Sequence, residues 1–157
     1  MAESLVGRAL GTYQVEAEIG TSRWGTVYRA SQRSMNRTVA LKTVSTEIAA
    51  LPGRTQHFLE EMQAAAQISH NHIVTIYEAG CIDGVNFCAM EFIDGPPLAD
   101  YLRKENLVDE QHLLQVIASV ARALDFLWQK QIPHQPLELK NILLDGNRTV
   151  KLINVLP

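Results

Sequence analysis

The chain has 157 residues, of which 46% are hydrophobic and 20% are charged, and its formal net charge is −3. This balance is typical of a globular protein and excludes a disordered or fibrous chain. The length suffices for one domain, or for one lobe and part of a second. A general binder of the nucleic-acid backbone needs a basic surface, so we expect no nucleic-acid partner.

The two cysteines, Cys81 and Cys88, are too few for a disulfide scaffold and lack the spacing of a metal site. They favour reduced thiols, and we therefore predict a cytoplasmic location. The first residues lack the apolar run of a signal peptide. No run of about 18 apolar residues occurs, so we expect no membrane-spanning segment in this chain.

The first part of the chain is predicted to be mainly strands. Alternating and β-branched residues indicate strands, whereas good helix formers with apolar side chains at helical spacing indicate one helix. The predicted strands cover residues 13–19, 25–30, 38–44, 73–79 and 85–92, and the predicted helix covers residues 55–68.

The second part begins at a break in residues 94–97, which read Asp-Gly-Pro-Pro. We place a boundary there, between residues 1–93 and 94–157. A short helix over 98–104, a long helix over 109–130 and short strands over 141–144 and 150–153 are expected. The long helix is apolar on nearly every side, which predicts burial all round. Strands with one inserted helix, followed by a mostly helical region, indicate the α+β class.

Residues 20–30 contain two glycines between two predicted strands. Backbone N–H groups of such a turn can approach phosphates closely because no Cβ stands in the way. Two glycines in a hairpin are more often only a turn. The next predicted strand reads Val-Ala-Leu-Lys over residues 39–42, and a lone strand lysine is usually a solvated edge residue.

Together, these two segments resemble the protein kinase family, and the bacterial serine/threonine type most of all. The family pattern G-x-G-x-x-G-x-V, followed by V-A-I-K, matches residues 20–27 and 39–42. Ser22 replaces the middle glycine and Trp24 adds bulk at the tip. The resemblance implies a protein-kinase-like fold, with a five-stranded antiparallel N-lobe carrying one helix and an incomplete helical C-lobe.

The resemblance also implies a nucleotide site. Glu61 is expected to pair with Lys42, although a solvated helix face is the alternative for Glu61. Met90 takes the gatekeeper position, and the backbone of Glu91 and Ile93 faces the adenine edge. The implied nucleotide-binding residues are Ile19, Gly20, Gly25, Val27, Ala40, Lys42, Glu61, Met90, Glu91, Ile93 and Leu143.

Residues 132–145 are similar to the family's catalytic loop and retain His134 and Asn141, but Pro136 occupies the position of the catalytic aspartate. Proline has no side-chain acceptor, so it cannot take a proton from a substrate hydroxyl. Asn154 replaces the aspartate that holds Mg²⁺. A neutral amide supplies no charge, so the metal site of Asn141 and Asn154 is expected to be weak at best. Asn141 could equally be a loop cap.

No catalytic site is intact by this comparison, and binding of ATP and Mg²⁺ is expected to be weak or absent. The leading hypothesis is a pseudokinase that serves as a protein-interaction or weak nucleotide-binding module. The alternatives are a divergent serine/threonine kinase that transfers the ATP γ-phosphate to protein hydroxyls, and a non-functional remnant. The chain stops at Pro157, before the rest of a helical C-lobe. We therefore expect helix 109–130 to bind a second copy of the chain or another protein.

Overall fold

The computed structural model describes residues 3–104 and 109–156. The chain divides into two compact units, the first formed by Met1–Gln67 with Ile76–Phe92 and the second by Ile68–Thr75 with Ile93–Pro157. The sequence-based division placed residues 1–93 in one continuous lobe. In the structure, residues 68–75 belong to the second unit instead.

Backbone pairing explains why this segment joins the second unit. The Val74 N–H donates to the Leu152 carbonyl at 2.9 Å, and the Leu152 N–H donates to the His72 carbonyl at 2.8 Å. Residues 73 and 74 therefore do not start the strand that was predicted over 73–79. That strand begins at Ile76 instead.

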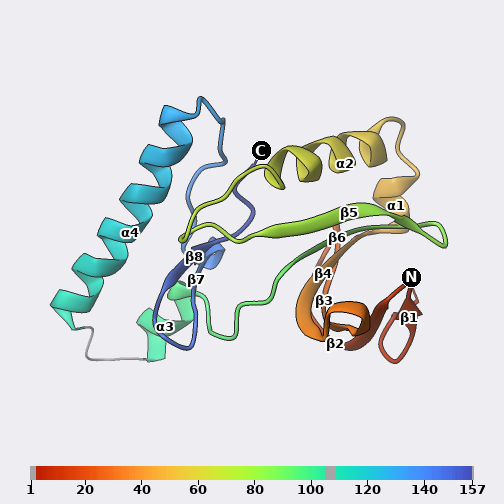
Figure 1. The fold of residues 1–157 in the computed structure, drawn as a ribbon, viewed down its shortest axis with the longest axis horizontal. Helices are drawn as coiled ribbons and strands as arrows, with labels where there is room; N and C mark the ends of the chain where they lie inside the picture. The colour runs from red at the N-terminus through yellow and green to blue at the C-terminus, as the bar shows by residue number, and fades with distance from the viewer. Residues whose placement is uncertain (1–2, 105–108, 157) are drawn as a thin grey trace. The chain divides into compact units, whose positions relative to one another are not determined.

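The first unit is built on a six-stranded antiparallel sheet with the order β1-β2-β3-β4-β6-β5 (Figure 1). All five expected strands are present, and a two-residue strand, β1, is added at the edge. The strands are β1 (Ala9–Leu10), β2 (Tyr13–Ser22), β3 (Gly25–Gln32), β4 (Arg37–Val44), β5 (Ile76–Ile82) and β6 (Val85–Glu91).

The sheet has one face that forms the core of the unit. Val39 and Leu41 alternate along β4 and are both fully buried, as the two-residue period of a strand requires. Tyr13 and Phe87 meet there edge to face, with ring centroids 5.7 Å apart. The buried cluster comprises Leu10, Tyr13, Val15, Tyr28, Ala30, Val39, Leu41, Phe87 and Ala89.

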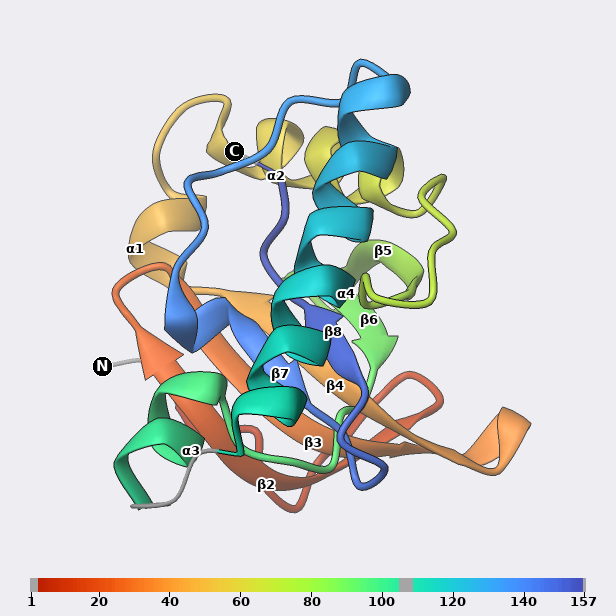
Figure 2. The ribbon, with the colours of Figure 1, turned by 90° about the vertical axis from the view of Figure 1, so that its left-hand side faces the viewer.

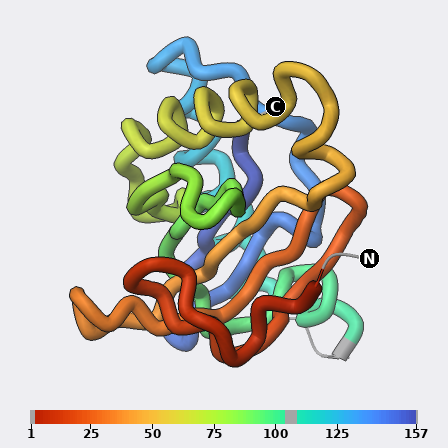
Figure 3. The backbone as a smooth tube through the Cα atoms, turned by 90° about the vertical axis from the view of Figure 1, so that its right-hand side faces the viewer, coloured from red at the N-terminus to blue at the C-terminus, as the bar shows by residue number. Residues whose placement is uncertain are grey.

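Two helices accompany this sheet, rather than the one expected. Helix α1 (Thr46–Ala49) is capped by Ser45, whose hydroxyl accepts the Ile48 N–H at 3.3 Å. Helix α2 (Arg54–Ala65) lies alongside β5 (Figure 1 and Figure 3). It ends three residues earlier than predicted, and Ile68 is buried in the core of the second unit.

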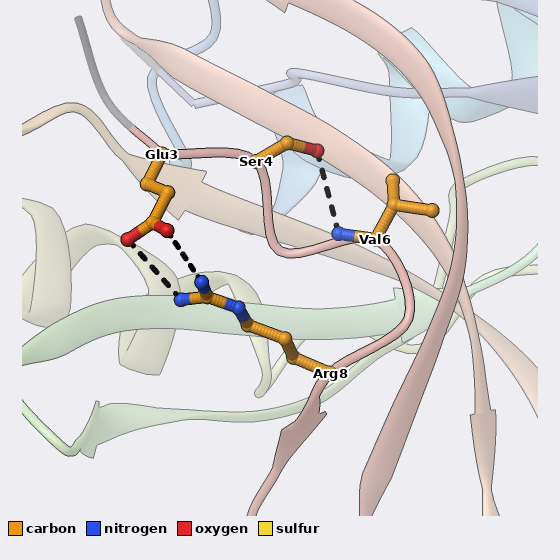
Figure 4. Close-up of polar contacts among 4 residues, drawn as sticks. All are labelled: Glu3, Ser4, Val6 and Arg8. Atoms are coloured by element: carbon orange, nitrogen blue, oxygen red, sulfur yellow. Dashed lines mark hydrogen bonds and ion pairs between the residues drawn. The ribbon is translucent and has the colours of Figure 1, made fainter.

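Two surface features complete the first unit. The connection between β3 and β4 contains the 3-10 turn η1 (Arg33–Met35) and extends away from the sheet (Figure 2 and Figure 3). Near the start of the chain, Arg8 forms an ion pair with Glu3, and the Val6 N–H donates to the Ser4 hydroxyl at 3.4 Å (Figure 4).

The second unit contains the remaining elements. Asp109 caps the long helix, because its carboxylate accepts the Gln111 N–H at 3.1 Å. Helix α4 lies against strand β8, as Figure 2 shows. The elements are α3 (Leu98–Lys104), α4 (Glu110–Gln129), the 3-10 turn η2 (Leu139–Asn141), β7 (Ile142–Leu144) and β8 (Val150–Leu152).

Within this chain, helix α4 is buried along one stripe only, and contact of its other apolar side chains with a second copy or a partner stays a prediction. The buried residues Val116, Val120, Ala123 and Leu127 recur at helical spacing and face the strands β7 and β8. Other apolar side chains of α4 lie on its open surface: Leu114 is 59% exposed, Ile117 55% and Trp128 82%. Among the described residues, no helix is both long and apolar enough to cross a membrane.

Candidate functional site

One face of the first unit's sheet carries four of the eleven predicted nucleotide-binding residues. Val27 pairs directly with Lys42 across β3 and β4, and Ala40 pairs with Met90 across β4 and β6. Because side chains alternate along a strand, Ala40 and Lys42 point away from the core face of Val39 and Leu41. Register therefore places Val27, Lys42, Ala40 and Met90 on the same surface.

The two glycines of the β2–β3 hairpin have different local surroundings. A Cβ added at Gly25 would lie 1.7 Å from the carbonyl oxygen of Thr43, so only glycine fits there. A Cβ at Gly20 would meet nothing within 4 Å, although Gly20 pairs with Val27 in the ladder. Ile19, next to it, is 51% exposed. Close packing therefore requires the glycine at position 25 but not the one at position 20.

Ser22 does more than add bulk to this hairpin. Its hydroxyl accepts the backbone N–H of Trp24 at 3.2 Å and approaches the carbonyl oxygen of Gly25 at 3.5 Å. A phosphate-binding turn offers its N–H groups to the ligand. The Ser22 hydroxyl already occupies one of these donors, an effect that sequence reasoning missed.

The tip of the hairpin is attached to the segment that leads into α1 and α2. The Ser45 N–H donates to the Trp24 carbonyl at 2.8 Å, and the Ser45 hydroxyl donates to the Arg23 carbonyl at 2.9 Å. The Trp24 ring lies beneath two guanidinium groups, with the Arg23 Cζ 4.7 Å and the Arg54 Cζ 5.8 Å from its centroid. These contacts hold the tip against the rest of the unit.

Lys42 is half-buried on β4, and this burial lowers the pKa of its ammonium group from the ordinary value. The charges of Cys88 and Glu61 oppose the decrease, so both groups lie within electrostatic range of Lys42. Cys88 pairs with Lys42 across the ladder. Burial raises the pKa of the Cys88 thiol to about 12, against the opposing charge of Lys42.

The carboxylate of Glu61 has a second neighbour on its own helix. The Nε2 atom of His57 lies 3.0 Å from the Oε1 atom of Glu61, one helical turn away on α2. The four-residue spacing of these two side chains could have predicted this contact from the sequence. The side chain of Glu61 is 25% exposed, so it is half-buried rather than fully solvated.

The remaining predicted nucleotide residues lie in two places. Met90 is buried and Glu91 ends strand β6, where it pairs with Val39. Ile93 and Leu143 belong to the second unit.

The segment that follows Ile93 is tied to strand β7. Pro97 forms a bridge with Leu143, and the Leu144 N–H donates to the Pro96 carbonyl at 3.2 Å. A Cβ at Gly95 would lie 1.6 Å from the Leu144 carbonyl oxygen, so this approach requires glycine at position 95.

The segment around Pro136 lies at the surface of the second unit. His134 is exposed, and its Nδ1 lies 2.8 Å from the carbonyl oxygen of Gln135. The Gln135 N–H donates to the Val155 carbonyl at 2.9 Å, and its side-chain amide donates to the Leu156 carbonyl. Pro136 itself is exposed and contributes neither a side-chain acceptor nor a backbone donor. This segment therefore offers no carboxylate at the position that the resemblance predicts for the family's base.

Asn141 and Asn154 are brought together in the second unit. The Nδ2 atom of Asn154 donates to the Oδ1 atom of Asn141 at 3.2 Å, and the Ile153 N–H donates to the Asn141 carbonyl at 2.9 Å. Asn154 has a positive φ of 51°, which asparagine tolerates better than most residues. Asn141 is buried, and its backbone N–H bonds to the Glu138 carbonyl, as a loop-ordering residue requires.

This pair does not fit a magnesium ion well. Mg²⁺ needs oxygen ligands directed at one point and is usually held by carboxylates. Here one amide oxygen accepts a hydrogen bond from the other amide, and neither residue carries charge. Within residues 3–104 and 109–156, no cluster of three or more His, Cys, Asp or Glu side chains could hold a metal ion.

The fold is protein-kinase-like. It combines a six-stranded antiparallel sheet, a strand that carries Lys42, and a hairpin that contains Gly20 and Gly25. Residues 13–154 match the protein kinase domain, and the chain belongs to the protein kinase family. The kinase domain of PknI from Mycobacterium tuberculosis superimposes with a TM-score of 0.79 at 26% identity, over 95% of this chain and 60% of that domain.

Curated serine/threonine-protein kinases are similar to the chain in sequence. PknJ, a serine/threonine-protein kinase of Mycobacterium tuberculosis, is 32% identical over 145 residues, which cover 92% of this chain and 24% of the relative. PrkC, a serine/threonine-protein kinase of Bacillus subtilis, is 28% identical over 149 residues, which cover 94% of this chain and 23% of the relative. The chain thus spans about a quarter of the length of the curated relatives it matches.

Proposed function

We propose that this member of the protein kinase family is catalytically inactive and serves as a protein-interaction module that binds nucleotide weakly at most. The observation that carries the proposal is the hydrogen bond from Asn154 to Asn141 at the positions where the family holds its metal. Phosphoryl transfer depends mainly on positioning and on metal ions that neutralise developing charge. Two neutral amides bonded to one another supply neither.

Two further features support the inactivity. Pro136 provides no general base, whose loss alone typically costs a factor of about 10²–10⁴ in rate. Ser22 binds a loop N–H group that a nucleotide phosphate would otherwise use. These effects act on different parts of the transition state, and their costs do not add simply.

A divergent serine/threonine kinase is the second candidate. Lys42 and Glu61 are retained within electrostatic range of each other, and the curated relatives are named as serine/threonine kinases. On that hypothesis the chain transfers the ATP γ-phosphate to protein hydroxyls in spite of the replaced residues. ATP and Mg²⁺ would then be its cofactors.

Phosphate transfer separates the two candidates directly. Purified chain is incubated with γ-labelled ATP, Mg²⁺ and a basic acceptor protein, with a Lys42→Met variant as the control. We expect no incorporation above the Lys42→Met background, and none after Pro136→Asp alone because the metal pair is unchanged. Incorporation that Lys42→Met abolishes would establish the kinase candidate and overturn the proposal.

The proposed contact with another protein is made by helix α4. Leu114, Ile117 and Trp128 are more than half exposed on this helix. Exposed apolar side chains gathered on one element favour contact with another surface. We infer that helix α4 associates with a second copy of the chain, or with a partner protein, and that nucleic acid is not a partner. We place the protein in the cytoplasm, a location supported by the unpaired thiols of Cys81 and Cys88.

A further inference from the structure

An open groove runs between helix α4 and the turn that joins β7 to β8, entirely within the second unit. Its volume is about 590 Å³, and it is lined on one side by α4 and on the other by the turn. A smaller hollow of about 400 Å³ continues it toward the start of α4. Its polar lining includes His112, Gln115 and Arg122 on α4, and Asn147 and Arg148 on the turn.

The groove is positively charged, although the chain as a whole carries a net charge of −3. Arg122 and Arg148 line its larger part, where no described aspartate or glutamate lies. Asp109 lines the smaller hollow, and its carboxylate accepts the Gln111 N–H that begins α4. Neither arginine forms an ion pair with any residue in the ranges 3–104 and 109–156. Two guanidinium groups without a carboxylate partner in one hollow favour an oxyanion ligand.

The nearest acidic side chain of the turn is already engaged. The carboxylate of Asp145 accepts the N–H groups of Asn147 at 2.8 Å and of Thr149 at 2.9 Å. The Arg148 N–H donates to the Asp145 carbonyl at 2.9 Å, which closes the turn. Asp145 therefore orders the turn that carries Arg148 and forms no ion pair with its guanidinium group.

His112 supplies the second, independent observation. This residue lines both hollows but is only 9% exposed, and its ring meets Tyr101 edge to face at 5.8 Å between centroids. Its Nε2 atom is buried and has no hydrogen-bond partner among the described residues. A buried nitrogen without a partner costs free energy, which a hydrogen bond formed when the ring turns toward either hollow would recover.

We propose that this groove, formed by Arg122, Arg148 and His112, binds a short acidic segment of a partner protein through carboxylate or phosphoryl oxygens. Both oxyanions suit two guanidinium groups, and Gln115 and Asn147 add amide donors for the peptide backbone. Leu114, which is 59% exposed, provides apolar contact beside the charges. The biological use of this binding rests on the proposed interaction role. The binding itself needs neither nucleotide nor phosphate transfer.

The test uses the whole 157-residue chain and three fluorescein-labelled peptides of the form Gly-Ser-Leu-X-Leu-Ser-Gly. The central residue X is glutamate, phosphoserine or glutamine, and fluorescence anisotropy gives each Kd at low salt. We expect the glutamate or the phosphoserine peptide to bind at least about tenfold more tightly than the glutamine peptide. The tighter of the two acidic peptides identifies the source of the oxyanion.

Three variants localise the binding. Arg122→Gln and Arg148→Gln should each weaken it at least about fivefold, and His112→Phe, which keeps a buried ring, should weaken it while the chain stays folded by circular dichroism. The matched control is Arg103→Gln, because Arg103 lies outside the groove and pairs with Asp100 at 3.6 Å. Equal affinity for all three peptides, or unchanged affinity in both groove arginine variants, overturns the proposal. Phosphate transfer is measured separately, so its outcome bears only on the proposed inactivity.

Discussion

The side-chain amide of Asn154 donates a hydrogen bond to the Oδ1 atom of Asn141, with 3.2 Å between the two heavy atoms. This contact joins two residues that lie 13 positions apart and that the sequence comparison assigned to a weak metal site. The bond directs an oxygen of one amide at a nitrogen of the other. The pair is therefore satisfied without an ion.

The first prediction concerns a change of Asn154 to aspartate. Asn154→Asp supplies a charged oxygen beside Asn141 and removes the donor that now occupies its Oδ1. We expect Mg²⁺ together with ATP to raise the melting temperature of the variant by about 2–4 °C, which corresponds to about 1 kcal/mol for a chain of this size.

Differential scanning fluorimetry with and without Mg²⁺ measures this shift. The parent chain should show no Mg²⁺-dependent shift, and neither should Asn36→Asp, which adds the same charge at an exposed turn of the first unit. A shift of equal size in all three proteins would contradict the argument.

The second prediction compares the two glycines of the β2–β3 hairpin. Gly25→Ala should lower the free energy of unfolding by roughly 1–3 kcal/mol, because its Cβ meets the backbone of Thr43 at 1.7 Å. Gly20→Ala should change it by no more than about 0.5 kcal/mol, since its Cβ meets open space. Urea unfolding of both variants provides the measurement, and similar losses in the two would show that the packing at Thr43 is not the cause.

The third prediction concerns pH. Burial lowers the pKa of His70 from its ordinary value, and the charges of His72 and Lys151 act in the same direction. The His72 N–H also donates to the Nδ1 atom of His70 at 3.0 Å, which requires that nitrogen to be unprotonated. The folded chain therefore holds fewer protons at His70 than the unfolded chain does just below the ordinary histidine pKa.

The sign follows from this difference in bound protons. The contribution of His70 to stability is complete above the unfolded pKa of about 6.5 and is lost as the pH falls through the folded value. We expect His70→Asn, whose Oδ1 can still accept the His72 N–H, to lose less stability than the parent between neutral and mildly acidic pH. Urea unfolding across that range tests it, with the exposed His134→Asn as the control that keeps the parent's slope. A parental slope in His70→Asn would refute the prediction.

The fourth prediction concerns association through helix α4. Ile117 and Trp128 are 55% and 82% exposed on this helix. If the chain of 157 residues self-associates through them, Ile117→Lys should shift sedimentation at micromolar concentration toward the monomer. Burying each such side chain favours association by up to roughly 1.5–3 kcal/mol, an amount large enough to detect.

The control for this experiment is Gln129→Lys, which adds the same charge on the same helix. Gln129 now donates to Asp125 at 2.7 Å, and a lysine can pair with that carboxylate at the same spacing. This variant should sediment like the parent. A parent chain that is monomeric at all concentrations would rule out self-association and leave a partner protein as the occupant of α4.

Much of the fold could be predicted from local sequence patterns. In strand β4, Val39 and Leu41 are fully buried and Lys42 is not. The two-residue period alone indicates that Val39 and Leu41 share the face opposite Lys42. Helix α3 has the predicted bounds, and α4 differs by one residue at each end because Asp109 supplies a recognisable cap. The position of Pro136 at the family's catalytic aspartate is likewise a prediction that the sequence alone makes, through the resemblance.

Other features depended on contacts between distant segments. Residues 73–75 read as the start of a strand, yet Ile73 and Val74 pair with Leu152, about 80 positions away, and local propensity carries no information on that partner. The stripe of α4 that the chain itself covers could not be chosen from the sequence because apolar residues surround the helix, and only packing against the strands β7 and β8 selects it.

The sequence by itself thus determined the family and the order of the main elements, and it predicts that the family's catalytic carboxylates are replaced. These properties are encoded in short patterns of side-chain chemistry and period, which neighbouring residues specify. The tertiary structure alone decided that Asn154 bonds to Asn141, that Ser22 occupies a hairpin N–H, and that Arg122 and Arg148 line one groove. Each of these depends on backbone segments that packing brings together. The spacing of residues along the chain does not specify the distances between such segments.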